Sequence, residues 1–323
     1  TEPNNMRLDL SDKKILVIDD FPQMRSSLRK MIQSFGAVDV DDAANGDDAI
    51  KKIDRKKYDI VLCDYSLGEG KDGQQVLEEA KHRNLLKYST IFMMITAETT
   101  SEMVMGAVEY HPDDYLTKPF TKEVLGKRLE KLIERKRDFD DIESAIYKKQ
   151  LDEAVALCDK HIAESPANLL EFLRLKSSLC LQTGRYGDAE AVCEKVLGMR
   201  AIPWAMLDMA RAHYSQKNYM RAQDVLKDLI ESNDACVEAY DWLAKCQEKL
   251  GEMRTAQESL ARAAELSPKS VLRQKALGEI AHRNNDLDVA ELSFARVLRL
   301  GRHSIYKSPR DYTNHAAVLV DKN

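Results

Sequence analysis

The sequence lacks the patterns that mark several common classes of protein. Its longest apolar run, IFMMITA at residues 91–97, is too short to cross a bilayer, which needs about 20 apolar residues. The seven histidines form no H-E-x-x-H motif, so no zinc site is indicated. Lysine and arginine number 49 against 54 aspartates and glutamates, and the resulting net charge of −5 does not favour binding to a nucleic-acid backbone. We therefore expect neither a membrane-spanning protein nor a DNA-binding one.

The six cysteines do not have the spacing of a disulfide or metal framework. None forms a C-x-x-C pair, and the last five lie within helical patterns. Buried free thiols in a reducing compartment are the simplest interpretation, so we expect a cytoplasmic protein. The cysteines are Cys63, Cys158, Cys180, Cys193, Cys236 and Cys246.

What the chain does have is two halves with different patterns. Up to about residue 137, short apolar runs alternate with amphipathic stretches. This alternation predicts an α/β domain with a parallel sheet covered by helices on both faces. Runs such as ILVI and IVLC are apolar throughout, as expected for strands buried on both sides. The predicted strands are residues 13–20, 38–44, 58–65, 90–97 and 113–119.

Polar residues follow or end four of these strands: Asp19 and Asp20, Asp64, Thr96, and Lys118. Each alone has an ordinary explanation, such as solvated loop charge or a helix cap, but ligands of open parallel sheets bind at the carboxyl ends of strands. Close carboxylates repel by roughly 4 kcal/mol per pair at an effective dielectric near 20, so the cluster needs a cation, and oxygen ligands suit Mg²⁺. A divalent ion, a lysine and a hydroxyl together suit the oxygens of a phosphoryl group.

These motifs closely resemble the response-regulator receiver domain of two-component signalling. ILVIDD supplies the acidic pair, IVLCDY supplies Asp64, MMITA supplies Thr96, and YLTKPF supplies Lys118 and Pro119. The intervals of 44 residues from Asp20 to Asp64 and 22 residues from Thr96 to Lys118 match the family.

The resemblance implies a doubly wound, flavodoxin-like sheet of five strands in the order 2-1-3-4-5. It also implies that Asp64 accepts a phosphoryl group from a sensor histidine kinase or phosphotransfer protein. Mg²⁺ would be held by Asp19, Asp20, Asp64 and the backbone carbonyl of Ser66, and the protein would not be an enzyme beyond this self-phosphorylation and dephosphorylation chemistry.

Further family features concern the phosphate and the switch. Lys118 and Thr96 would bind the phosphate, and movement of Thr96 would open space for the Tyr115 ring. A cis bond between Lys118 and Pro119 would point the lysine into the pocket. One departure follows the acceptor: DYSLGEGKDG has Leu-Gly where most receivers have Met-Pro, and it reaches Gly73 one residue late. We therefore expect a longer and more flexible loop there.

After residue 137, the predicted strands end and a repeat appears. Five alanines recur with a period near 34, and a turn at Gly184, Asn218, Gly251 or Asn285 lies about five residues before each of the last four. The pattern resembles the tetratricopeptide repeat over residues 139–304, an all-α solenoid, although the usual tryptophan is mostly absent. A small residue suits the place where two helices cross closely, and an irregular helical bundle is the alternative. The alanines are Ala154, Ala189, Ala222, Ala256 and Ala290.

The predicted domains are a tail (1–12), a receiver (13–137), repeats (138–304) and a partial extra helix (305–323) that leaves a truncated repeat as an alternative. Helical repeats bind polypeptides along a concave surface. By analogy with the family, first-helix residues would line it, although the aromatic ones fit inter-repeat packing equally well. They are Arg174, Trp204, Leu207, Arg211, Tyr214 and Lys245.

Three functions compete at this stage. The leading one is a phosphorylation-switched adaptor that signals through its repeats. The others are a constitutive scaffold with a non-switching receiver, and a regulator whose output domain lies beyond residue 323. The segment TKEVLGKRLEKLIERKRDFDDIESAI carries no glycine–proline hinge between the halves, so we expect it to transmit the Tyr115 rearrangement and to change dimerisation or repeat packing. A passive tether is the alternative.

Overall fold

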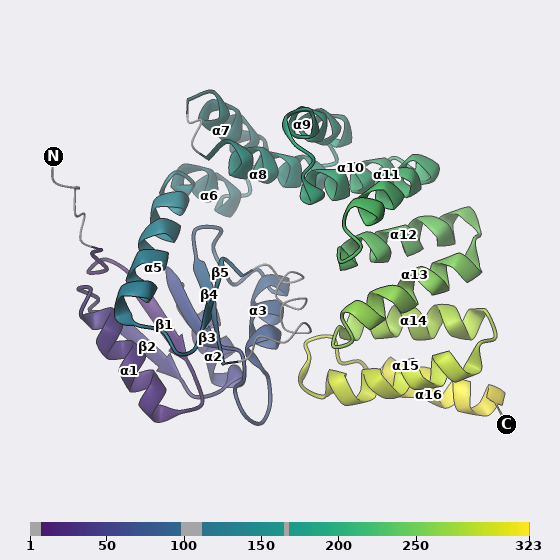
Figure 1. Ribbon diagram of the computed structural model, residues 1–323, viewed down its shortest axis with the longest axis horizontal. Coiled ribbons are helices and arrows are strands. Elements are labelled where there is room, and N and C mark those ends of the chain that lie inside the picture. Colours follow the sequence, from purple (N-terminus) through teal and green to yellow (C-terminus); the bar gives the residue numbers. More distant parts are fainter. Residues whose placement is uncertain (1–7, 98–111, 165–167, 323) are drawn as a thin grey trace. The chain divides into compact units, whose positions relative to one another are not determined.

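The structure is a computed structural model that describes residues 8–97, 112–164 and 168–322 (Figure 1). The chain divides into two compact units, and the main boundary lies between Glu143 and Ser144, whereas the sequence analysis placed it after residue 137. Among the described residues, no helix combines the length and apolar character that a bilayer crossing requires.

The first unit contains a parallel sheet in the order β2-β1-β3-β4-β5, which confirms the predicted fold class and strand order. Every predicted strand is present. The strands are β1 Lys14–Ile18, β2 Asp39–Ala43, β3 Ile60–Asp64, β4 Ile91–Thr96 and β5 Asp114–Thr117. Within its described residues, this unit has the helices α1 Pro22–Gln33, α2 Gly46–Arg55, α3 Gly73–His82 and α5 Lys122–Arg137.

The sheet has a separate hydrophobic core on each face, because successive strand residues point to opposite sides. On one face, Leu16 and Ile18 of β1 pack with residues of α2 and α3. On the other, Ile15 and Val17 pack with Leu28 and other residues of α1 and α5. Burial of β1 on both faces explains why its sequence is apolar throughout rather than alternating.

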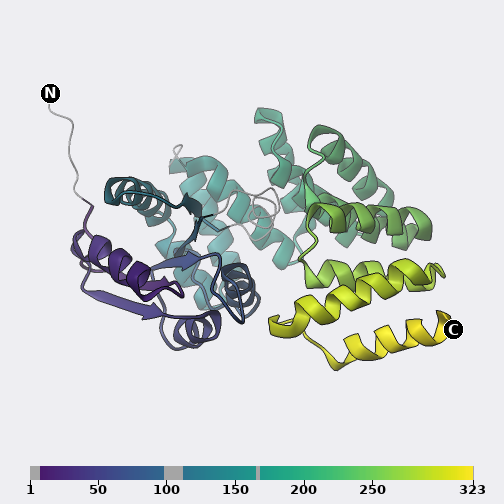
Figure 2. The same ribbon diagram turned by 60° about the horizontal axis from the view of Figure 1, so that its bottom comes forward.

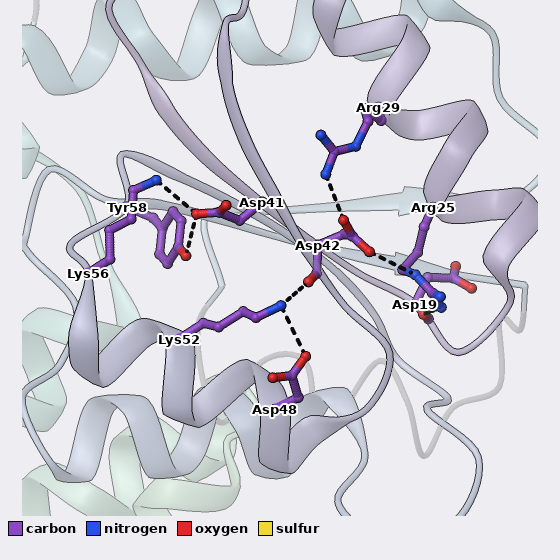
Figure 3. A network of polar contacts seen from close by, with 9 residues as sticks. All are labelled: Asp19, Arg25, Arg29, Asp41, Asp42, Asp48, Lys52, Lys56 and Tyr58. Atoms are coloured by element: carbon purple, nitrogen blue, oxygen red, sulfur yellow. Dashed lines mark hydrogen bonds and ion pairs between the residues drawn. The ribbon is translucent and has the colours of Figure 1, made fainter.

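The edge strand β2 carries three aspartates and is surrounded by basic side chains (Figure 3). Lys56 Nζ lies 2.5 Å from Asp39 Oδ1 and 2.8 Å from Asp41 Oδ2, and the Tyr58 hydroxyl donates to the same Asp41 oxygen at 2.8 Å. Charged side chains on an edge strand oppose pairing with another chain. The third aspartate, Asp42, pairs with Arg25 and Arg29 of α1.

The second unit is a series of antiparallel helix pairs, with neighbouring helices side by side in Figures 1 and 2. Its helices are α6 Asp140–Tyr147 (which spans the boundary), α7 Leu151–Glu164, α8 Leu169–Gln182, α9 Tyr186–Met199, α10 Pro203–Ser215, α11 Tyr219–Ser232, α12 Val237–Leu250, α13 Met253–Leu266, α14 Val271–Arg283, α15 Leu287–Leu300 and α16 Pro309–Lys322. A short 3-10 turn, Gly301–His303, follows α15.

The repeat predicted from the alanines is present in the backbone and in the packing. All five alanines have no exposed surface, and each is the fourth residue of the second helix of a pair. In the first helix of a later pair, Gly278 has the small position, and a Cβ there would lie 3.0 Å from the Phe294 ring. The turn inside each pair contains one residue with positive φ, again with a period near 34: Lys149, Gly184, Lys217, Gly251 and Asn285.

The junction between α5 and α6 is anchored to the first unit. The helices are separated by Asp138 and Phe139, so the segment is two helices rather than one. The Phe139 side chain is only 2% exposed, and its ring centroid lies 5.2 Å from that of Tyr88. Lys136 Nζ donates to the Tyr88 carbonyl at 2.9 Å and pairs with Asp113 Oδ1 at 2.8 Å. These contacts fix the end of α5 to residues that flank β4 and β5.

We predict that Phe139→Ala lowers the free energy of unfolding of the first unit by about 3–5 kcal/mol, because it removes a buried aromatic ring. Denaturant unfolding followed by circular dichroism measures the change. Tyr147→Ala is the matched control, since Tyr147 is 85% exposed and its loss should cost less than about 0.5 kcal/mol. Equal effects of the two substitutions would contradict the anchoring role of Phe139.

Candidate functional site

Three carboxylates meet at the carboxyl ends of β1 and β3. Asp19 and Asp20 directly follow β1, and Asp64 is the last residue of β3, which pairs with β1 in the sheet. One oxygen from each of the three lies within 4.8 Å of the others. Asp19 has no exposed surface and Asp64 is buried, so their mutual repulsion is weakly screened by solvent. The sequence prediction of an acidic cluster at this edge is therefore reproduced in the geometry.

Lys118 lies against this cluster from the end of β5. Its Nζ is 3.0 Å from Asp19 Oδ2 and 3.0 Å from Asp64 Oδ2. The Lys118–Pro119 peptide bond is cis, as expected, and the Lys118 amide donates to the Thr96 carbonyl at 2.6 Å. Pro119 follows the end of β5, and Lys118 before it extends toward Asp19 and Asp64 at the carboxyl ends of the strands.

The electrostatics of the site follow from burial and from this ion pair. Burial raises the pKa of Asp64, and the Lys118 ammonium offsets only part of that rise. Burial lowers the pKa of Lys118, but its hydrogen bonds to Asp64 and Asp19 outweigh the effect, so that its pKa lies above the usual value. The lysine therefore stays charged at neutral pH, and three carboxylates still face one ammonium.

The donor set fits a hard divalent cation. Its ligand atoms are all carboxylate oxygens, which Mg²⁺ prefers. Asp20 Oδ1 is buried and accepts no hydrogen bond within the described part of the chain, so it has an unused ligand position at the cluster. Ser66, whose carbonyl is the further predicted ligand, lies in the loop just after β3, and its role stays a prediction.

The loop from Tyr65 to Asp72, between β3 and α3, is attached at several points. The Gly73 amide donates to the Tyr65 carbonyl at 2.8 Å, and Lys71 Nζ pairs with Asp47 Oδ1 of α2 at 2.5 Å. A Cβ at Gly73 would lie 2.2 Å from the Asp64 carbonyl oxygen, so only glycine fits there. Gly68, in the left-handed region at φ 69°, also lies close to the acids, since a Cβ there would be 3.1 Å from Asp20 Oδ2.

The remaining predicted switch residues lie near the acceptor edge. Thr96 is the buried last residue of β4 and pairs in register with Thr117. Tyr115 of β5 is partly buried against the core under α2 and α3, and burial raises the pKa of its hydroxyl. Pro119 is exposed. Movement of Thr96 and Tyr115 stays a prediction.

Sequence reasoning missed one basic residue at the site. Arg25, in the first turn of α1, donates from Nη1 to the carbonyl of Asp19 at 2.7 Å and to that of Asp20 at 3.2 Å. Its Nε lies 3.3 Å from Asp42 Oδ2 on β2 (Figure 3). An arginine shortly after an acidic pair is visible in the sequence, but the pattern does not show where its side chain reaches.

The predicted repeat-surface residues have different environments. Leu207 is only 7% exposed and packs with residues of α11 and α12, so it offers little surface to a partner. Trp204 is half-buried against the core of α8 and α9. Arg174 is exposed on α8.

The other three predicted residues gather around Trp242 of α12, which the sequence analysis did not select. Lys245 Nζ lies 4.0 Å from the centroid of the Trp242 ring, and Arg211 Cζ lies 5.6 Å from it. Tyr214 meets the same ring edge-on at 5.4 Å. We call these four residues the Trp242 cluster.

Comparison with known proteins matches both halves of the chain. A family model described as the response regulator receiver domain matches residues 15–130. Models described as tetratricopeptide repeat and as anaphase-promoting complex, cyclosome, subunit 3 match residues 248–305 and 182–263. These matches confirm the resemblances drawn from the motifs and from the repeat.

Individual relatives cover the first half. Chemotaxis protein CheY-3 of Vibrio cholerae is 30% identical over 122 residues, which are 38% of this chain and 92% of that protein. Chemotaxis protein CheY of Pseudomonas aeruginosa is 29% identical over 122 residues, 38% of this chain and 97% of that protein. Among solved structures, MamA of Desulfovibrio magneticus RS-1 is 23% identical with a TM-score of 0.44, covering 52% of this chain and 95% of that one.

We predict that Gly73→Ala destabilises the first unit by about 3 kcal/mol, because the new methyl group would overlap the Asp64 carbonyl and displace the loop. Denaturant midpoints measure the loss. Gly187→Ala on α9 is the control: nothing lies within 4 Å of its Cβ, and alanine should be neutral or stabilising by up to about 1 kcal/mol. A stable Gly73→Ala protein would contradict the close approach described here.

Proposed function

The chain belongs, through residues 15–130, to the response regulator receiver family, and we propose that it accepts a phosphoryl group on Asp64 and signals through its helical repeats. The observation that carries the proposal is the position of Lys118, whose ammonium lies 3.0 Å from both Asp19 and Asp64 beside three converging carboxylates. A fixed cation beside a buried carboxylate is suited to hold an anionic group attached to that carboxylate.

The proposed reaction is an in-line phosphoryl transfer. A carboxylate oxygen of Asp64 forms a bond to phosphorus as the nitrogen–phosphorus bond of a phosphohistidine breaks, and the histidine nitrogen leaves with the electron pair. Lys118 would then bind a phosphoryl oxygen, and the Thr96 hydroxyl would donate to another. The donor would be a sensor histidine kinase or a phosphotransfer protein.

Asp19, Asp20, Asp64 and the Ser66 carbonyl would hold Mg²⁺ in this reaction. The bound ion would supply positive charge to offset that of the transferring group. The buried, unpaired Asp20 Oδ1 supports this assignment, because a buried carboxylate oxygen without a partner is costly. Beyond this chemistry on its own aspartate, we propose no enzyme activity on a separate substrate.

We predict that a small phosphodonor raises the intact mass of the protein by one phosphoryl group, and only when Mg²⁺ is present. Asp64→Ala should gain no mass, because the acceptor oxygen is absent. The control is Asp12→Asn, which removes an exposed carboxylate in the turn before β1, at the other end of that strand from the site, and which should react like the wild type. Equal phosphorylation of Asp64→Ala, or of the wild type in EDTA, would refute the assignment.

For the output, we propose that the repeats bind a polypeptide. The Trp242 cluster, together with the exposed Arg174, supports this, because aromatic and arginine side chains dominate protein-binding surfaces. The acidic net charge and the absence of a basic recognition helix in the sequence make nucleic acid a poor partner. A cytoplasmic site of action is part of the same proposal.

We predict that a fragment starting at residue 138 is strongly helical by circular dichroism. We also predict that the fragment, at micromolar concentration, does not shift the migration of duplex DNA in a mobility-shift assay. Salt-sensitive DNA binding by the fragment would contradict a protein-binding output. Trp242→Ala is a useful companion variant, since loss of the half-buried ring should leave helicity close to that of the wild-type fragment.

We further propose that phosphorylation changes dimerisation or the packing of the repeats, through α5 and the anchored junction at Phe139. The expected result is that beryllofluoride with Mg²⁺ alters the sedimentation coefficient and the small-angle scattering profile of the full chain. Asp64→Ala should abolish the difference, because beryllofluoride mimics a phosphoryl group on that residue. Identical mass and shape in both states would instead favour a constitutive scaffold whose receiver does not switch.

A further inference from the structure

Arg25 connects the acidic pair to two other elements of the first unit. From α1, its Nη1 donates to the carbonyls of Asp19 and Asp20 at 2.7 and 3.2 Å. Its Nε lies 3.3 Å from Asp42 Oδ2, in the β2 edge strand. The Arg25 side chain is 16% exposed, which is low for an arginine and indicates a fixed position. Figure 3 shows the guanidinium between Asp42 and the loop that carries Asp19.

The two carbonyls that Arg25 binds belong to residues that lie beyond the end of strand β1. β1 ends at Ile18, α1 begins at Pro22, and the acidic pair lies in the loop between them. The loop is otherwise held by the Asp19 amide, which donates to the Ala43 carbonyl at 3.2 Å, and by the Phe21 amide, which donates to Asp19 Oδ1 at 2.9 Å. Neither bond reaches Asp20. Among the side chains that the structure describes, Arg25 is thus the one that binds the backbone carbonyls of both Asp19 and Asp20.

On the side away from the acids, Arg25 pairs with a carboxylate that it shares with a second arginine. Asp42 accepts from Arg25 and also from Arg29, whose Nη2 lies 2.6 Å from Asp42 Oδ1. The carbonyl of Asp42 accepts from Lys52, which pairs with Asp48 at 3.1 Å. Arg25 contacts the backbone carbonyls of the acidic pair, whereas Lys118 contacts the carboxylates of Asp19 and Asp64. Arg25 therefore acts on the acidic pair mainly through the geometry of its backbone.

We propose that Arg25 is a positioning residue for the metal site: it fixes the backbone of Asp19 and Asp20 so that both carboxylates are aligned for a divalent cation. This rests on the proposed function, because it assumes that the acidic cluster binds Mg²⁺. A guanidinium can serve two carbonyls and a carboxylate at once with its fixed fork of donors, whereas a lysine ammonium cannot reproduce that fork. Groups that orient metal ligands in this way typically contribute 10–100-fold to metal affinity.

The test is the affinity of the full-length protein for Mg²⁺ alone, measured by isothermal titration calorimetry without phosphodonor. We expect Arg25→Gln and Arg25→Lys to weaken binding by about 10–100-fold. Arg29→Gln is the matched control, because Arg29 pairs with the same Asp42 but does not contact the acidic pair; its affinity should stay within about twofold of wild type. Circular dichroism melts in EDTA report the folding of each variant, and Arg25→Lys carries the test if Arg25→Gln does not fold.

Each outcome separates this inference from the proposed function. If the wild type binds no Mg²⁺, the proposed metal site itself fails. If the wild type binds and folded Arg25→Gln binds equally well, the metal site stands and the positioning role is overturned. Full affinity in Arg25→Lys would mean that positive charge alone suffices. An equal loss of affinity in Arg29→Gln would mean that the removal of either cation beside Asp42 weakens binding, whether or not that cation contacts the acidic pair. Either result would also overturn the proposal.

Discussion

The repulsion among Asp19, Asp20 and Asp64 is the constraint on which the rest of the first unit depends. Buried carboxylates at one sheet edge are tolerated only if cations and hydrogen-bond donors surround them. Lys118 supplies the direct cation, and Arg25 supplies donors to the backbone behind the pair. The three carboxylates outnumber the one ammonium that contacts them, and this deficit of positive charge is the feature on which the proposed divalent-ion site rests.

This arrangement requires that several strands end at the same level. The parallel order β2-β1-β3-β4-β5 places the carboxyl ends of β1 and β3 side by side and those of β4 and β5 next to them. The two hydrophobic cores fix that register, since a slip of one residue in β1 would move Leu16 and Val17 to the opposite faces. The glycine at position 73 then lets α3 begin directly against the Asp64 carbonyl. Core packing and site geometry are therefore set by the same strands.

The second unit is stabilised differently, because each helix pair buries little apolar surface alone and depends on packing against its neighbours. Each pair meets at a fully buried alanine, and each turn passes through a residue with positive φ at the same place in the period. The cost of a left-handed residue is modest, and it repeats because the pair geometry repeats. Where the small position falls on a first helix, as at Gly278, the contact with the Phe294 ring shows why size is restricted. The Trp242 cluster joins α10 and α12, and its Tyr214 and Trp242 rings pack partly against the core between these helices.

The sequence by itself determined the strands, their buried character, the acidic cluster opposite Lys118 and the period of the repeat. Each of these depends on local periodicity, or on the rule that parallel strands end at a common edge. Only the tertiary structure decided that Arg25 reaches Asp42 and the two loop carbonyls, that Phe139 packs on Tyr88, and that Leu207 is core while Trp242 collects Arg211, Tyr214 and Lys245. These contacts join segments that are distant along the chain. Periodicity shows which face a side chain occupies, but the partner it meets depends on how far it extends and on which element packs against that face.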